Sequence, residues 1–205
     1  MDAVMRRSPV SFAGAVAARS QSRGDWQVVL EYQDQGQGPW LVDLSHCPRW
    51  DLQDSSLDEL HPWGLAMPQG FNQVLIQDGW LVNRLNRTQA QLWYLGGEEI
   101  EPPAEPGLTE ITDGQCLLAL VGDEALSVME TACKLDLADP SRTPPFLVQG
   151  PVLHIPCQIV RLAGAVLMGF SRGYGQSFAE ALLESGRPWG LKPGGEEVFS
   201  RLLAG

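Results

Sequence analysis

The second half of the sequence alternates apolar strands with two amphipathic helices, and this order restricts the fold more than any other feature of the chain. Residues 114–122 read GQCLLALVG, an apolar run of strand length, and the segment 123–135 places its apolar residues on one helical face. Two further strands are predicted in 150–162 and 165–171, and a second helix in 175–185. The order β-α-β-β-α is typical of a ferredoxin-like α+β unit, in which both helices cover one side of an antiparallel sheet.

The two helices are predicted from their caps and apolar faces. The first opens on Asp123, a residue type that caps helix N-termini well. Its buried face is predicted to comprise Ala125, Val128, Met129, Ala132 and Leu135, and that of the second helix Phe178, Ala181 and Leu182.

The first half is predicted to contain strands, a hairpin and one short helix. Strands in 26–32 and 39–44 flank the turn-forming segment DQGQG, and Asp78-Gly79 between two apolar runs is a strong hairpin signal. The segment RTQAQLWYL that follows has its leucines at helical spacing after Thr88, which predicts a capped helix.

An acidic, proline-rich segment divides the chain. Residues 96–108 contain GGEEIEPPAEPG, which is typical of a surface connection. We therefore expect an N-terminal extension over 1–24, a first α+β half over 25–95, this linker over 96–108 and a second ferredoxin-like half over 109–205.

Composition argues against several classes of protein. A net charge of −11 and scattered basic residues argue against a nucleic-acid partner, and no apolar run approaches the roughly 20 residues of a membrane span. The four cysteines lie far apart, which predicts free thiols in a reducing cytoplasm. Six of the seven tryptophans fall in the first half, and such rings are enriched at interfaces as well as in cores, so a subunit of a larger assembly is considered.

The segment VDLSHCPRWDL, residues 42–52, places a histidine beside a cysteine. Adjacent side chains on a strand point to opposite faces, so His46 is not expected to act as a base for Cys47. No two of His46, His61 and His154 have a short metal-binding spacing, so no metal site is predicted. His154, inside VLHIP, is predicted to be a hydrogen-bonded strand histidine.

Three segments, in order, resemble the T-protein family, the folate-dependent aminomethyltransferases of glycine cleavage. VDLSHCPRWDL is similar to the family's Asp-x-Ser-His segment, LLALVGDEALSVMETACKL to a strand that leads into a helix, and WGLKPGGEEVFSRLLAG to its GLKP turn. The first segment is thus interpreted as a fold landmark in which Asp43 and Ser45 tie down a strand end. The family's catalytic acid pair is reduced here to the single Asp78, and RLAGAVLMGF lacks the family's GYTGE-type folate sequence.

A short T-protein-like chain with an RRSPVSF start and no catalytic signature resembles the gamma subunit family of heterotetrameric sarcosine oxidase. The resemblance implies an α+β, T-protein-like fold of tandem ferredoxin-like β-α-β-β-α units with antiparallel sheets. It also implies a non-catalytic, cytoplasmic subunit that supports assembly with a large T-protein-like alpha subunit. No cofactor is expected on this chain; tetrahydrofolate, flavin and NAD are implied in the partner subunits, which demethylate sarcosine oxidatively and feed folate one-carbon metabolism.

Two alternatives remain open at this point. The chain could be a stand-alone folate-binding or aminomethyltransferase-like one-carbon protein that uses Asp78 as its catalytic acid. It could also be an unrelated ferredoxin-like sensor of small molecules, a hypothesis that rests on the order of elements alone.

Overall fold

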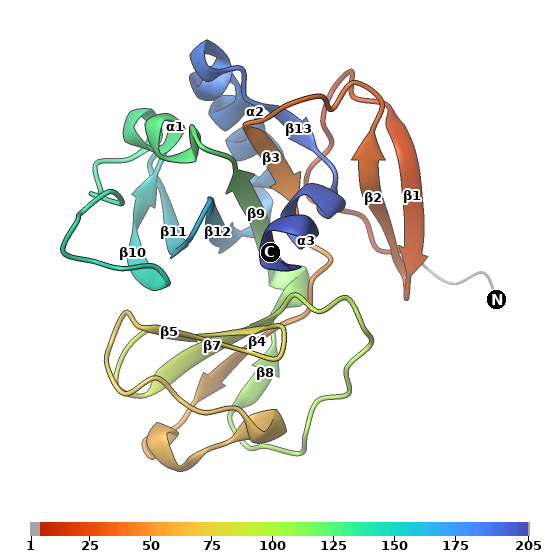
Figure 1. The fold of residues 1–205 in the computed structure, drawn as a ribbon. Helices are drawn as coiled ribbons and strands as arrows, with labels where there is room; N and C mark the ends of the chain where they lie inside the picture. The colour runs from red at the N-terminus through yellow and green to blue at the C-terminus, as the bar shows by residue number, and fades with distance from the viewer. Residues whose placement is uncertain (1–4, 205) are drawn as a thin grey trace.

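The computed structural model describes residues 5–204, and within this range three sheets and three α-helices make a mixed α+β fold (Figure 1). The α+β prediction with antiparallel sheets is confirmed; among the strands of the described residues, only β13 and β3 pair in parallel. Residues 1–4 of the expected N-terminal extension lie outside the described range. The rest of the extension enters β1 (Ala17–Arg23), which forms a two-stranded hairpin with β2 (Trp26–Tyr32).

The largest sheet has six strands in the order β10-β11-β12-β9-β3-β13. Its strands are β3 (Trp40–Asp43), β9 (Gln115–Val121), β10 (Phe146–Val152), β11 (Ile155–Leu162), β12 (Ala165–Ser171) and β13 (Lys192–Gly194). On one face, Leu118 and Leu120 pack in a core with the helices α1 (Ala125–Ala132) and α2 (Gly175–Gly186). This arrangement is the one expected for a ferredoxin-like unit, because both helices cover the same side.

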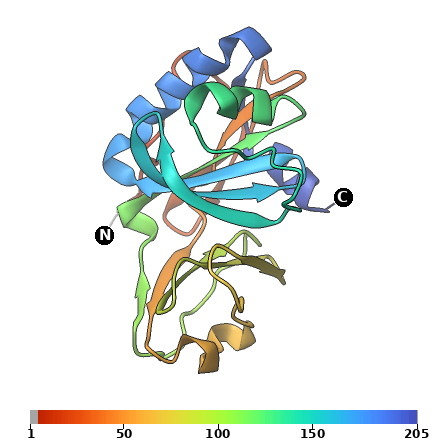
Figure 2. The same ribbon diagram turned by 90° about the vertical axis from the view of Figure 1, so that its left-hand side faces the viewer.

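The opposite face of this sheet packs against a second, five-stranded sheet and against helix α3 (Glu196–Ala204). The five-stranded sheet has the order β5-β6-β7-β4-β8. Its strands are β4 (Arg49–Gln53), β5 (Val74–Gln77), β6 (Trp80–Arg84), β7 (Gln89–Tyr94) and β8 (Leu108–Glu110). Figure 2 shows the two sheets as separate layers. Two segments of the chain connect them, one from β3 to β4 and the other from β8 to β9.

All of this second sheet is inserted between β3 and β9, which pair with each other. Within it, β5 and β6 form the hairpin predicted from Asp78-Gly79, with both residues at positive φ, 48° and 80°. That prediction is confirmed, since the Asp-Gly pair tolerates the backbone of a tight hairpin turn.

The predicted helix after Thr88 is wrong, because residues 89–94 form strand β7. This strand lies between β4 and β6 in the sheet. Residues 90–94 are all buried, so the segment lacks the alternation of a half-exposed strand. The backbone N–H of Thr88 binds the side chain of Asn86, in a turn instead of a helix cap.

The single strand predicted over 150–162 is also wrong, because the chain turns back on itself at Leu153 and His154. These residues have φ values of 48° and 67° and connect β10 to β11. His154 is therefore a turn residue and not a strand histidine. Three strands, β10, β11 and β12, therefore lie between α1 and α2, where the β-α-β-β-α order predicts two.

The predicted helix faces hold for six of the eight residues. Ala181 is exposed and Ala179 is buried in its place, while Leu135 lies beyond the end of α1 and is half-buried. Asp123 does not cap α1, since the N-cap residue is Glu124 and makes no side-chain capping bond.

The tryptophans belong to the interior of the protein. Four rings are buried, those of Trp26, Trp50, Trp80 and Trp93, and the other three are half-buried. Trp63 packs against both Trp50 and Trp80 with tilted rings, whose centroids are 4.7 and 4.5 Å away. The number of tryptophans is thus explained largely by packing inside this chain.

The four cysteines are all unpaired, as their spacing predicts. In the part of the chain that is described, no helix has the length and apolar character needed to cross a membrane.

Candidate functional site

The candidate site begins where the chain leaves β3. Asp43 Oδ1 accepts a hydrogen bond from the backbone N–H of Ser45 at 2.9 Å, and its Oδ2 accepts one from the hydroxyl of Ser8. Ser45 Oγ in turn accepts the N–H of Leu117 on β9 at 3.2 Å. The prediction that Asp43 and Ser45 tie down a strand end is confirmed, and these bonds fold residues 44–48 into a turn.

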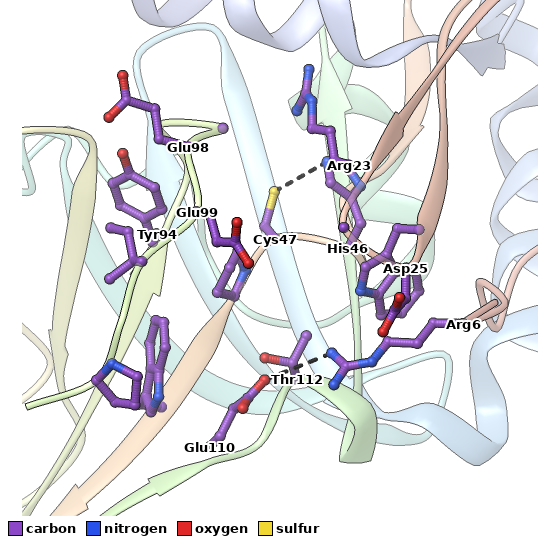
Figure 3. Close-up of a pocket in the computed structure, with 17 residues that line it drawn as sticks. Arg6, Arg23, Asp25, His46, Cys47, Tyr94, Glu98, Glu99, Glu110 and Thr112 are labelled. Carbon is purple, nitrogen blue, oxygen red and sulfur yellow. Dashed lines mark hydrogen bonds and ion pairs between the residues drawn. The ribbon is translucent and has the colours of Figure 1, made fainter. Parts of the chain in front are cut away.

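Because of this turn, His46 and Cys47 lie close together. Cys47 Sγ is 3.7 Å from His46 Nε2, as the dashed line in Figure 3 marks. The prediction that the two side chains point to opposite faces is wrong, since it assumes a strand that in fact ends at Asp43. Strand alternation does not apply within a turn.

A third side chain, Glu196 at the start of α3, joins the pair. Its Oε1 lies 2.9 Å from His46 Nε2 and accepts a hydrogen bond from Arg23 Nη1 at 2.6 Å. Glu196 and His46 are largely withdrawn from solvent, with side chains 7% and 10% exposed. The cluster of Arg23, His46, Cys47 and Glu196 thus joins the hairpin β1–β2, the turn after β3 and α3.

The charges in this cluster are set by mutual contacts that outweigh burial. Burial lowers the pKa of His46, but the contacts with Cys47 and Glu196 raise it to about 10. Burial raises the pKa of Glu196, but the hydrogen bonds from His46 and Arg23 bring it below its ordinary value. Both shifts act in the direction that favours an ion pair between the imidazole and the carboxylate.

The cluster opens onto a cavity of about 430 Å³ (Figure 3). Its other walls come from Arg6, the turn 24–26, the start of β4, residues Glu110 and Thr112, and the acidic segment that contains Glu98 and Glu99. Arg6 lies 3.9 Å from Glu110 and 3.5 Å from Asp113. The segment 96–108 is therefore both a surface connection and one wall of the cavity.

Asp78, the only acid that the sequence offered for catalysis, is not at this cavity. It lies exposed in the β5–β6 turn, where its Oδ2 accepts a hydrogen bond from Gln77 at 3.5 Å. The sequence reasoning missed Glu196 as a site residue. A signal was present, because Glu196 falls in the GLKPGGEE segment that resembles a family landmark.

Beneath the cluster, the buried Arg49 binds the two segments of the chain that connect the sheets, one from β3 to β4 and the other from β8 to β9. Arg49 is 0% exposed and its guanidinium donates hydrogen bonds to backbone carbonyls. The acceptors are Leu44, Ser45 and Cys47 on the passage from β3 to β4, and Thr112 and Gln115 on the passage from β8 to β9, at 2.9 to 3.3 Å. The guanidinium therefore fixes the backbone that carries His46 and Cys47.

Chemically, the cluster offers three ligand atoms of different kinds, a thiol sulfur, an imidazole nitrogen and a carboxylate oxygen. They lie within 4.8 Å of one another. Such a set can share protons or hold a metal ion, and the cavity gives a small molecule access to it.

Comparison with known proteins finds one partial sequence match and two solved structures of similar fold. No protein-family model matches the chain. It is 31% identical over 109 residues to sarcosine oxidase subunit alpha of Rhizobium meliloti (strain 1021), a match that covers 49% of this chain and only 11% of that protein.

Two solved structures share the fold. A chain of the heterotetrameric sarcosine oxidase from Corynebacterium sp. U-96, in complex with pyrrole 2-carboxylate, superposes with a TM-score of 0.59 at 12% identity, over 73% of this chain and 84% of that one. The glycine cleavage system aminomethyltransferase T from Bartonella henselae superposes with a TM-score of 0.57 at 17% identity, over 89% of this chain and 57% of that one. The predicted T-protein-like fold and the resemblance to T-protein and sarcosine oxidase chains are confirmed.

Proposed function

We propose that this chain is a non-catalytic, gamma-type subunit of a heterotetrameric sarcosine-oxidase-like complex. The main support is the share of each relative's own length that the match with this chain covers. The superposition covers 84% of the Corynebacterium oxidase chain, but only 57% of the aminomethyltransferase, and the sequence match covers 11% of the alpha subunit. The likeness thus extends along most of a small chain from an oxidase complex, and along only parts of the larger proteins.

In this proposal the partner subunits carry the redox and folate chemistry. The flavin, NAD and tetrahydrofolate are held by the larger chains, including a T-protein-like alpha subunit, and the methyl carbon of the amine passes to one-carbon metabolism. The exposed position of Asp78 in a hairpin turn, away from the cavity, supports a non-catalytic role, because small-molecule sites are typically concave. The four free thiols suit the reducing cytoplasm in which we place the complex.

The edge strand β5 is the surface we assign to partner binding. It is the outermost strand of its sheet, so one side of its backbone has no neighbouring strand. Leu75 and Ile76 on this strand are 38% and 53% exposed, and Phe71 just before it is 60% exposed. Exposed apolar side chains beside an open sheet edge are typical of a surface that another chain covers.

Co-purification tests the proposal. A tagged copy of the chain, expressed in its native cells, is expected to bring down a flavin-containing large subunit, and the flavin of that eluate should be reduced on addition of sarcosine. The Ile76→Lys variant is expected to lose this partner, whereas Leu203→Lys, at a 41% exposed position on α3, is a matched control and should keep it. Elution of the wild-type chain alone would contradict the assignment.

Titration with tetrahydrofolate separates this proposal from the stand-alone one-carbon protein. We expect no heat change when the isolated chain is titrated with millimolar tetrahydrofolate. Saturable binding that disappears in Asp78→Asn would favour the alternative instead.

A further inference from the structure

The arrangement around His46 differs from that of a catalytic triad. In a Cys–His–acid relay the acid binds one ring nitrogen and the nucleophile faces the other, so that the acid orients the base. Here Cys47 Sγ and Glu196 Oε1 both approach the same nitrogen, Nε2, at 3.7 and 2.9 Å. A single hydrogen on Nε2 cannot donate a linear hydrogen bond to both atoms at once, whereas a metal ion bound to all three atoms would use both contacts.

The spacing of the three ligand atoms also suits a larger cation. Zinc binds sulfur at about 2.3 Å and nitrogen or oxygen at about 2.0–2.2 Å, so the corners of its tetrahedron are about 3.3–3.6 Å apart. Two of the three observed separations, 2.9 and 3.7 Å, lie on either side of this range, and all three atoms lie within 4.8 Å of one another. Small side-chain movements would therefore bring all three atoms to bonding distance of one ion.

The surroundings provide the other parts of such a site. Cys47 and Glu196 are 5% and 6% exposed, which shields the ligands from bulk water, while the cavity of about 430 Å³ leaves one direction open. Arg23 donates to the Glu196 carboxylate, as outer partners of ligating carboxylates commonly do. Three protein ligands with one open position are characteristic of catalytic rather than structural zinc sites.

We propose that Cys47, His46 and Glu196 form a binding site for a zinc-type divalent ion, with its fourth position open to the cavity. The ion takes the place of the proton on His46 Nε2, and the thiol of Cys47 releases its proton on binding. The mixed sulfur, nitrogen and oxygen set selects Zn²⁺ or Co²⁺ over Mg²⁺, which prefers oxygen ligands alone. This site is independent of the proposed oxidase assembly, because all three ligands belong to this chain.

Titration of the purified full-length chain with Zn²⁺ or Co²⁺ alone tests the proposal. We expect one ion per chain, a thiolate-to-cobalt charge-transfer band in the near ultraviolet, and no competition from millimolar Mg²⁺. Because loss of even an outer partner weakens metal sites 10- to 100-fold, Cys47→Ser and Glu196→Gln are expected to weaken Zn²⁺ binding by about 100-fold or more. Cys133→Ser, which changes a half-buried thiol outside the cluster, is the matched control and should bind as the wild type does.

A second measurement on the wild type remains decisive if a variant does not fold. Bound Zn²⁺ is expected to slow alkylation of Cys47 by at least 10-fold, measured on its peptide by mass spectrometry, and to leave alkylation of Cys133 unchanged. A cobalt complex without the charge-transfer band, equal Zn²⁺ affinity in Cys47→Ser, or unprotected Cys47 would each overturn the proposal.

Discussion

Replacement of Arg49 by methionine should destabilise the whole fold, because this one side chain joins both passages of the chain between the sheets. Methionine keeps much of the volume but removes every donor. The carbonyls of Ser45, Cys47, Thr112 and Gln115 then each lose a hydrogen bond from a charged group. The carbonyl of Leu44 is less affected, since it also accepts the N–H of Cys47 at 2.9 Å.

The size of the effect follows from these four lost bonds. A buried acceptor left without its donor costs about 1–3 kcal/mol, so four of them at the lower bound give about 4 kcal/mol. Removal of the buried charge recovers part of its desolvation cost and so limits the loss of stability. Loss of the hydrogen-bond network around the guanidinium increases that loss. We therefore expect Arg49→Met to lower the free energy of unfolding by about 3–5 kcal/mol. Arg49→Lys should lie between this variant and the wild type, because one ammonium has only three donors.

Urea denaturation followed by tryptophan fluorescence measures the loss directly. Arg201→Met is the control, since Arg201 is 71% exposed on α3 and its ion pair with Glu197 is a surface contact. That control is expected to change the free energy of unfolding by no more than about 0.5 kcal/mol. If Arg49→Met lies within about 1 kcal/mol of the wild type, the reasoning from lost acceptor partners is refuted.

Three further predictions concern packing, backbone and charge. Gly169→Val should lower stability by about 1–3 kcal/mol in thermal unfolding, because even a Cβ at this position lies 2.8 Å from the Trp93 ring; unchanged stability would mean that the ring moves freely. Gly79→Ala should lower it by more than about 1 kcal/mol in urea, since φ is 80° and a Cβ would meet the Gly96 backbone at 3.2 Å. The contribution of Glu196 to the free energy of unfolding should be fully present above pH 4.5 and lost as the pH falls through the lowered pKa of the folded state. The difference in stability between the wild type and Glu196→Gln should therefore shrink below pH 4.5. A difference that stays constant with pH would contradict the direction of this pKa shift.

Features with local chemical causes could be predicted from the sequence. The hairpin at Asp78-Gly79 follows from a dipeptide that accepts positive φ, and the faces of α1 and α2 follow from apolar periodicity. The hairpin at Leu153 and His154 is not predicted, because leucine rarely adopts positive φ and the pair is not one of the usual Asn-Gly or Asp-Gly turn signals. The sequence predicts a helix at strand β7 because Leu92 and Leu95 have helical spacing and follow Thr88, a residue type that caps helices, and burial on both faces of the strand cannot be read from this pattern.

The candidate site could not be predicted, because it depends on one strand end and one distant pairing. His46 and Cys47 come together only because β3 stops at Asp43, a boundary that local propensity does not determine. Glu196 reaches them because β13 pairs in parallel with β3, with Gly194 opposite Val42, and α3 begins two residues later. No short spacing in the sequence records that long-range contact.

The insertion of the five-stranded sheet between two paired strands has a consequence for the order of folding. Asp43 and Leu118 are partners in the β3–β9 ladder, yet the whole inserted sheet separates them along the chain. If the insert were unfolded, closure of a loop of about 70 residues would cost roughly 3–4 kcal/mol of chain entropy. A folded insert brings its own two ends together and removes most of this cost. The five-stranded sheet, in which β5, β6 and β7 are joined by short-range hairpins, is therefore expected to form first, and pulse-labelled hydrogen exchange should detect protection in β6 and β7 before it appears in β3.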